Sequence, residues 1–199
     1  PVDATFIGVH EHDMRLPDWG RFDRQDHAHE MQALRLDLER AHPLPQREDG
    51  SPDWARLAEA PDLLDAELAR ANLDVRILEL ETFHFRDLNP ALWTGEAIFG
   101  VIALILRPFA SYRDRSVSLA ARLLRIQPFL GMMAGTLGGP IPSPWIARAR
   151  RECAAAARLL DQGVIRWQSA QTPAAKRSVG RLSMQLAMDA SRAGEAFER

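Results

Sequence analysis

The most informative part of this 199-residue chain reads Asn89-Pro90-Ala91-Leu92-Trp93-Thr94-Gly95-Glu96-Ala97-Ile98-Phe99-Gly100-Val101-Ile102-Ala103-Leu104-Ile105-Leu106-Arg107-Pro108. Asn89-Pro90 favours a turn, Thr94 is suited to cap a helix start, and Pro108 is suited to end the helix. The run from Ala97 to Leu106 carries no charge, which predicts a helix without a solvated face, and it is shorter than the ~20 residues of a membrane span. We therefore expect a central helix wrapped by other helices.

Helix signals recur on both sides of this stretch. Apolar steps of three and four residues predict a helix within residues 21–41, and a longer helix that begins at Pro61 and ends near Phe83. The apolar positions of the longer helix repeat in four-three-four-three steps, which we interpret as a seam packed against partner helices. They are Leu64, Leu68, Ala71, Val75 and Leu78.

Further helices are expected toward the C-terminal end. Residues 114–125 show an amphipathic pattern that Pro128 either kinks or ends. The Ser-Pro and Thr-Pro pairs at 51–52, 143–144 and 172–173 are helix start signals, which predict helices over residues 144–168 and from Pro173 to the end of the chain.

These patterns predict an all-α fold, a multi-helix array or bundle with one central buried helix. The exception is Thr5-Phe6-Ile7-Gly8-Val9, which is β-prone and predicts a short strand near residues 5–9. From the length and the 46% of hydrophobic residues, we expect residues 1–199 to form a single helical domain.

Charge and cysteine content narrow the classes of function. The 25 basic and 27 acidic residues are interspersed, so no basic patch for nucleic acid or a membrane surface is predicted, and no membrane span either. The single cysteine, Cys153, precedes a run of alanines and is expected to be an inert residue of a packed helix face. The compartment is taken as the cytoplasm by default, and secretion is left open because Pro1 is not an initiator methionine.

Two blocks of the sequence resemble a known family. Residues 1–18, Pro-Val-Asp-Ala-Thr-Phe-Ile-Gly-Val-His-Glu-His-Asp-Met-Arg-Leu-Pro-Asp, and residues 89–108 resemble the N-terminal part of the bacterial domain of unknown function 885 family. The resemblance implies a zinc metallopeptidase-like hydrolase whose metal ligands come from a His-Glu…His helix in the C-terminal half. That helix is absent from residues 1–199, because neither His10-Glu11-His12 nor His29-Glu30 has a further His one or two turns on. The resemblance therefore implies that residues 1–199 are the N-terminal portion of a longer protein. This portion would have neither catalytic nor metal-binding residues of its own.

The polar group His10, His12 and Asp13 is the candidate site. In one interpretation Gly8 permits a tight turn, and the group hydrogen-bonds neighbouring helices or faces solvent. By the resemblance, the opening segment lies against the catalytic half, so these residues contact a peptide or small-molecule substrate while zinc is held elsewhere. A third interpretation is a barrel hydrolase in which His10 and His12 follow a strand and bind a metal, but a barrel needs strands that the rest of the sequence lacks.

Three functions are compatible with these interpretations. The favoured one is the channel wall or lid of a zinc-dependent peptidase or hydrolase, with the C-terminal catalytic half as its partner. The second is a non-catalytic helical scaffold or interaction domain. The third is the His-x-His metal-dependent hydrolase.

Overall fold

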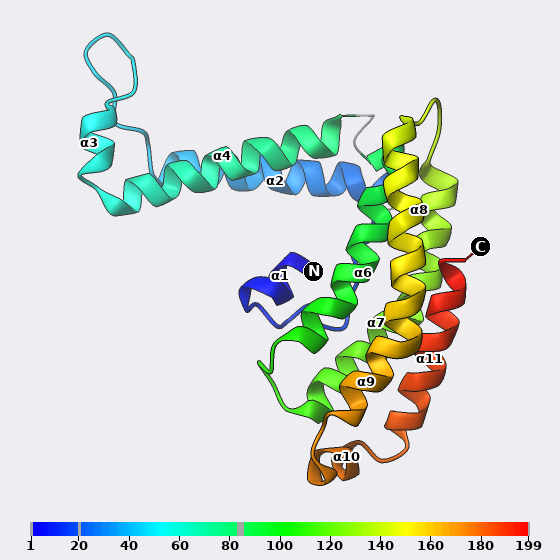
Figure 1. Cartoon of the computed structure of the whole chain (residues 1–199). Coiled ribbons are helices and arrows are strands. Elements are labelled where there is room, and N and C mark those ends of the chain that lie inside the picture. The colour runs from blue at the N-terminus through cyan, green and yellow to red at the C-terminus, as the bar shows by residue number, and fades with distance from the viewer. Residues whose placement is uncertain (1, 20, 83–85, 199) are drawn as a thin grey trace. The chain divides into compact units, whose positions relative to one another are not determined.

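The computed structural model describes residues 2–19, 21–82 and 86–198, which form two compact units. Unit 1 comprises Pro1–Trp19 and Arg86–Arg199, and unit 2 comprises Gly20–Phe85. Most of the described residues lie in helices, and the described residues contain one isolated bridge but no β-strand, which confirms the all-α prediction (Figure 1). None of these helices is both long and apolar enough to cross a membrane. The expectation of a single domain stays a prediction, because compact units need not fold independently.

Unit 1 is built around a core shared by four long helical stretches. Its elements are α1 (Val2–Ile7), α6 (Pro90–Leu106), α7 (Tyr112–Thr136), α8 (Ser143–Arg158), the π-helical turn η1 (Leu159–Gly163), α9 (Val164–Ser169), α10 (Pro173–Val179) and α11 (Leu182–Ala196). Since the junctions on both sides of η1 keep helical backbone angles, α8, η1 and α9 run on as one helix. α6 packs against α7 and α8, and α11 packs against α7, as Figure 1 shows. The core contains Trp93, Val101, Leu104, Leu119, Ile126, Leu160 and Leu186.

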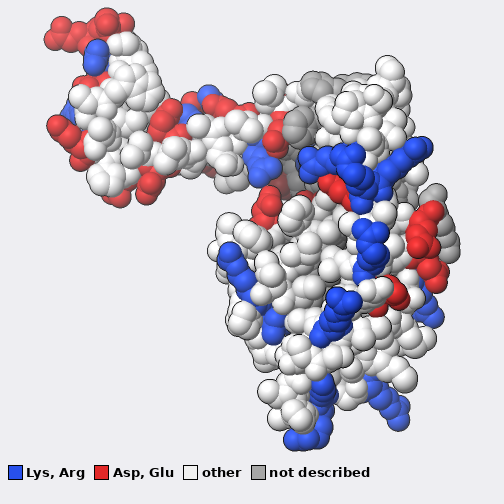
Figure 2. Space-filling model, viewed as in Figure 1, with Lys and Arg blue, Asp and Glu red and all other residues white. Residues whose placement is uncertain are grey.

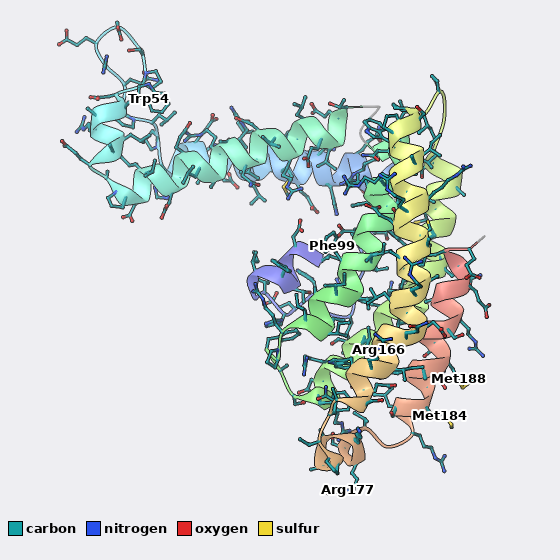
Figure 3. The ribbon with its side chains drawn as sticks, in the orientation of Figure 1. Trp54, Phe99, Arg166, Arg177, Met184 and Met188 are labelled. Atoms are coloured by element: carbon teal, nitrogen blue, oxygen red, sulfur yellow. The ribbon has the colours of Figure 1, made fainter. Side chains whose placement is uncertain are left out.

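The predicted central helix is α6, but its uncharged run is buried on only part of its circumference. Ala97, Val101 and Leu104 are buried in the core, whereas Leu106 and Phe99, which is labelled in Figure 3, are exposed. The prediction of a helix without a solvated face is therefore wrong. Apolar residues are not confined to interiors, since there are too few polar residues to cover a surface. Pro90 occupies the first turn, so the helix also begins before Thr94, the predicted cap.

The predicted strand near residues 5–9 is wrong, because Val2–Ile7 forms helix α1. Val2 and Thr5 are buried three residues apart on one helical face, and this packing outweighs the weak β-propensity of the run. Gly8 ends the helix with φ +97°, and the Val9 amide donates to the Ala4 carbonyl at 2.8 Å, as in a Schellman motif. The strand on which the barrel hydrolase depended is therefore a helix.

Prolines and glycines later in the chain act partly as predicted. Thr172 caps α10 by accepting from the Ala175 amide, whereas Gly180, with φ +51°, ends α10 and separates it from α11. The single helix predicted from Pro173 is therefore two helices. Pro128 lies inside α7, which continues to Thr136 rather than ending at the proline.

Unit 2 consists of α2 (Arg21–Ala41), α3 (Trp54–Ala58) and α4 (Pro61–Glu81). α2 and α4 form an antiparallel pair. Gln32 of α2 donates a hydrogen bond to Glu81 of α4, and Arg35, which follows Gln32, donates to Asp74, which precedes Glu81. The predicted end of α4 near Phe83 falls outside the described residues, and the helix ends at Glu81. The face that α4 buries carries Ala66, Arg70 and Leu80 rather than the predicted seam.

Candidate functional site

The candidate residues lie in a tight turn directly after α1. The Asp13 amide donates to the His10 carbonyl at 3.3 Å, which closes the turn. Asp13 is buried, and its Oδ1 accepts from the Thr5 hydroxyl at 2.6 Å. The Oδ2 atom of Asp13 lies 3.1 Å from His10 Nδ1. The structure therefore brings His10 and Asp13 together and adds Thr5, which the sequence pattern did not single out.

His10 is held on a second side by an aromatic ring. Its imidazole stacks on Phe109, with ring centroids 4.0 Å apart and an interplanar angle of 8°. The side chain remains 38% exposed, so the ring is oriented but accessible. With Nδ1 at Asp13, Nε2 is the ring nitrogen left for a hydrogen-bonding group of a ligand.

Arg122, from α7, is the buried cation of this site. Its Nη1 donates to the Gly100 carbonyl at 2.6 Å and its Nη2 to the Thr5 hydroxyl at 2.6 Å. Nη2 also donates to the backbone carbonyl of His12 at 3.4 Å, which is how His12 joins the cluster. Burial lowers the pKa of Arg122 to about 10, against the opposing effect of the Asp13 and Glu96 carboxylates. The guanidinium therefore stays charged at neutral pH.

Gly100 is the point at which the N-terminal segment, α6 and Arg122 meet. A Cβ atom at this position would lie 2.8 Å from Leu16 Cδ2 and 3.4 Å from Val2 Cγ2, so glycine permits the close approach. Residues 2–18 and residues 89–108 thus pack against each other around the Arg122 guanidinium.

The amino-acid pattern of α7 carries a signal for Arg122. Arg115 and Arg122 are seven residues apart on the same buried face of α7 as Leu119 and Ile126. A cation at an apolar helical position must find oxygens to bond. Arg115 does so at the end of α6, where it donates to the carbonyls of Leu104, Arg107 and Ala110. The helical spacing of Arg115 and Arg122 could have identified both as buried arginines, but it does not identify their hydrogen-bond partners.

A second polar cluster joins α6 to α8. The Thr94 hydroxyl donates to Glu152 Oε2 at 2.5 Å, and Arg148 Nε donates to Glu152 Oε1 at 2.7 Å. Burial, and then the Glu152 carboxylate, raise the pKa of the neighbouring Cys153 thiol. A raised pKa disfavours the thiolate, so this cluster offers no activated nucleophile.

Within residues 2–19, 21–82 and 86–198, no group of three or more His, Cys, Asp and Glu side chains is placed to hold a metal ion. The geometry suits contact between the oriented His10 imidazole and a ligand. The buried hydrogen bonds of Thr5, Asp13 and Arg122 fix the segment that carries His10. Comparisons with protein-family models, with curated proteins and with solved structures found no match.

Proposed function

We propose that this chain is the N-terminal helical part of a zinc-dependent hydrolase related to the domain of unknown function 885 family, and that it forms a wall or lid of the substrate channel. The observation that carries the proposal is the packing of residues 2–18 on residues 89–108 around Arg122. The two blocks on which the resemblance rests form one packed feature, and this contact is what supports the proposal.

In this proposal His10 contacts the substrate. Asp13 and Phe109 fix its imidazole while the ring remains accessible, and an oriented side chain loses little rotamer freedom when a ligand binds. His12 and Asp13 support the segment from behind, through the His12 carbonyl and the Asp13 carboxylate. Zinc and the catalytic residues belong to the partner half.

The test compares the chain alone with the chain extended by the polypeptide encoded after residue 199. Elemental analysis after dialysis and a peptidase assay should show neither stoichiometric zinc nor cleavage for residues 1–199, and both for the extended protein. In the extended protein, His10→Ala should raise KM more than it lowers kcat, with the exposed His27→Ala as the control. One tightly held zinc per 199-residue chain, lost on His10→Ala and His12→Ala together, would overturn the proposal in favour of the His-x-His hydrolase.

A second candidate, the helical interaction module, is favoured by one observation. The seam predicted on α4 is exposed in the chain, and a helix face of this kind suits a protein partner.

A further inference from the structure

The outer face of α4 carries an apolar stripe that no described residue of unit 2 covers. Leu64, Leu68, Val75 and Leu78 are 42%, 61%, 55% and 64% exposed, and Ala71 between them is exposed as well. These are the residues whose spacing predicted a packed seam. Their exposure means that the stripe faces away from α2.

The spacing of the stripe selects a helix as its occupant. Steps of four, three, four and three residues from Leu64 to Leu78 are the a and d positions of two heptads. A facing helix inserts its side chains between such positions, whereas an extended strand, with a period of two residues, does not match them. The stripe therefore fits an amphipathic helix with the same repeat.

The charge of the residues beside the stripe indicates which charge a partner helix should carry. The flanking e and g positions are Asp65, Asn72 and Glu79 on one side, and Glu67, Asp74 and Glu81 on the other. No flanking position is basic. Within unit 2, some of these carboxylates have partners: Glu67 bonds Arg70, Asp74 bonds Arg35, and Glu79 bonds Arg76.

The excess of negative charge remains after these pairings. Residues 20–85 contain fifteen acidic and eight basic residues, while the whole chain has a net charge of only −2. Figure 2 shows red acidic side chains along the visible surface of this unit. Two copies of α4 paired through their stripes would place carboxylates opposite carboxylates in either orientation, which disfavours a second copy as occupant.

We propose that the outer face of α4 is a docking site for an amphipathic helix of a partner protein, with apolar residues at heptad spacing and Lys or Arg at the flanking positions. Apolar burial along the stripe supplies the affinity, and the acidic flanks select the partner and its register. This proposal does not depend on the proposed hydrolase function.

The probe is a synthetic peptide of about three heptads with Leu at a and d and Lys at e and g. Its own flanks repel each other, so it does not pair with itself. One control peptide carries Glu in place of Lys, and another carries Ser in place of Leu. Binding to the full chain is measured by isothermal titration calorimetry at low and high salt. We expect binding of the Lys peptide that weakens with salt, and at least about tenfold weaker binding of both control peptides.

Variants of the chain test whether the stripe is the site. Leu68→Ser with Val75→Ser should weaken binding by about tenfold or more, and Asp65→Lys by several-fold. The matched control is Leu34→Ser with Leu36→Ser, two exposed leucines of α2 that lie outside the stripe, which should leave affinity unchanged. Circular dichroism checks that each variant keeps the helical content of the parent.

Three results would overturn the proposal. The first is no binding of the Lys peptide, and the second is equal binding of the Lys and Glu peptides. The third is a dimer of the parent chain in sedimentation that Leu68→Ser with Val75→Ser dissociates, since the occupant would then be a second copy.

Discussion

Arg122 holds together segments that are more than a hundred residues apart in the chain. Its guanidinium bonds the Thr5 hydroxyl and the carbonyls of His12 and Gly100, and no part of its side chain reaches solvent. Removing it would leave several buried oxygens with one donor fewer and Asp13 without its nearby positive charge. The cost of an unsatisfied buried polar group is about 1–3 kcal/mol, and more where a charge is involved.

Arg122→Ala should therefore lower the free energy of unfolding by about 3 kcal/mol or more. Arg125→Ala, at an exposed position of the same helix, should change it by less than about 0.5 kcal/mol. Urea denaturation followed by circular dichroism measures both. Equal stability of the two variants would mean that water replaces the guanidinium without cost.

Cys153 permits a direct test of a pKa direction, since it is the one cysteine of the chain. Burial and the adjacent Glu152 carboxylate raise the pKa of its thiol. The folded chain should therefore hold less thiolate than the unfolded chain near pH 9, so that alkylation by iodoacetamide is slower and its pH midpoint higher. The contribution of this thiol to stability is present below the unfolded pKa and is lost as the pH rises through the folded pKa. Matching pH midpoints with and without urea would contradict the assignment.

At the scale of the element, the two sides of α6 contribute unequally to the free energy of unfolding. Leu104 is fully buried in the core, while Leu106 is 64% exposed on the same helix. Leu104→Ala should destabilise the chain by about 2–5 kcal/mol, because it removes apolar contacts and leaves a cavity. Leu106→Ala should cost less than about 1 kcal/mol. Thermal unfolding of the pair tests whether the central helix is buried on one face.

Replacing glycine by alanine should have opposite effects on stability at two positions. Gly8 has φ +97° and ends α1, so Gly8→Ala should destabilise the chain by about 1 kcal/mol or more through backbone strain. Gly131 is exposed within α7, and a Cβ there meets no atom within 4 Å, so Gly131→Ala should stabilise by about 0.5–1 kcal/mol. Chemical denaturation of both variants gives the signs. A neutral Gly8→Ala would indicate that the turn carrying His10 and Asp13 relaxes.

At the scale of the molecule, apolar burial is unequal between the two units. Fully buried apolar residues such as Trp93, Leu104, Ile126 and Leu186 all belong to unit 1. The described apolar residues buried in unit 2 are Ala28, Leu57, Ala66 and Leu80. Local opening is easiest where few apolar contacts must be broken.

Native-state hydrogen exchange should therefore show faster exchange for the amides of α2 and α4 than for those of α6 and α7. Leu104→Ala should lower protection in unit 1 and leave it unchanged in unit 2. Uniform protection across all four helices, with a uniform loss in the variant, would mean that the two units open together.

The all-α class and several helix limits could be predicted from the sequence, because these depend on contacts within about four residues along the chain. Pro61 stands at a helix start as predicted, and Thr172 caps α10 with its own hydroxyl. The sequence also singled out His10, His12 and Asp13, a polar group close after Gly8, which permits a tight turn. The structure joins His10 to Asp13 through the carboxylate.

The contacts between these elements could not be predicted from the sequence. Contacts between residues far apart in sequence determine the Val2–Ile7 helix, the partners of Arg122 and the position of Phe109 against His10. The periodicity of apolar residues does not show which distant residues will meet. The heptad on α4 was visible in the sequence, but whether it is covered was not. The spacing of apolar residues along a helix defines a face, whereas the burial of that face depends on which other element reaches it in three dimensions.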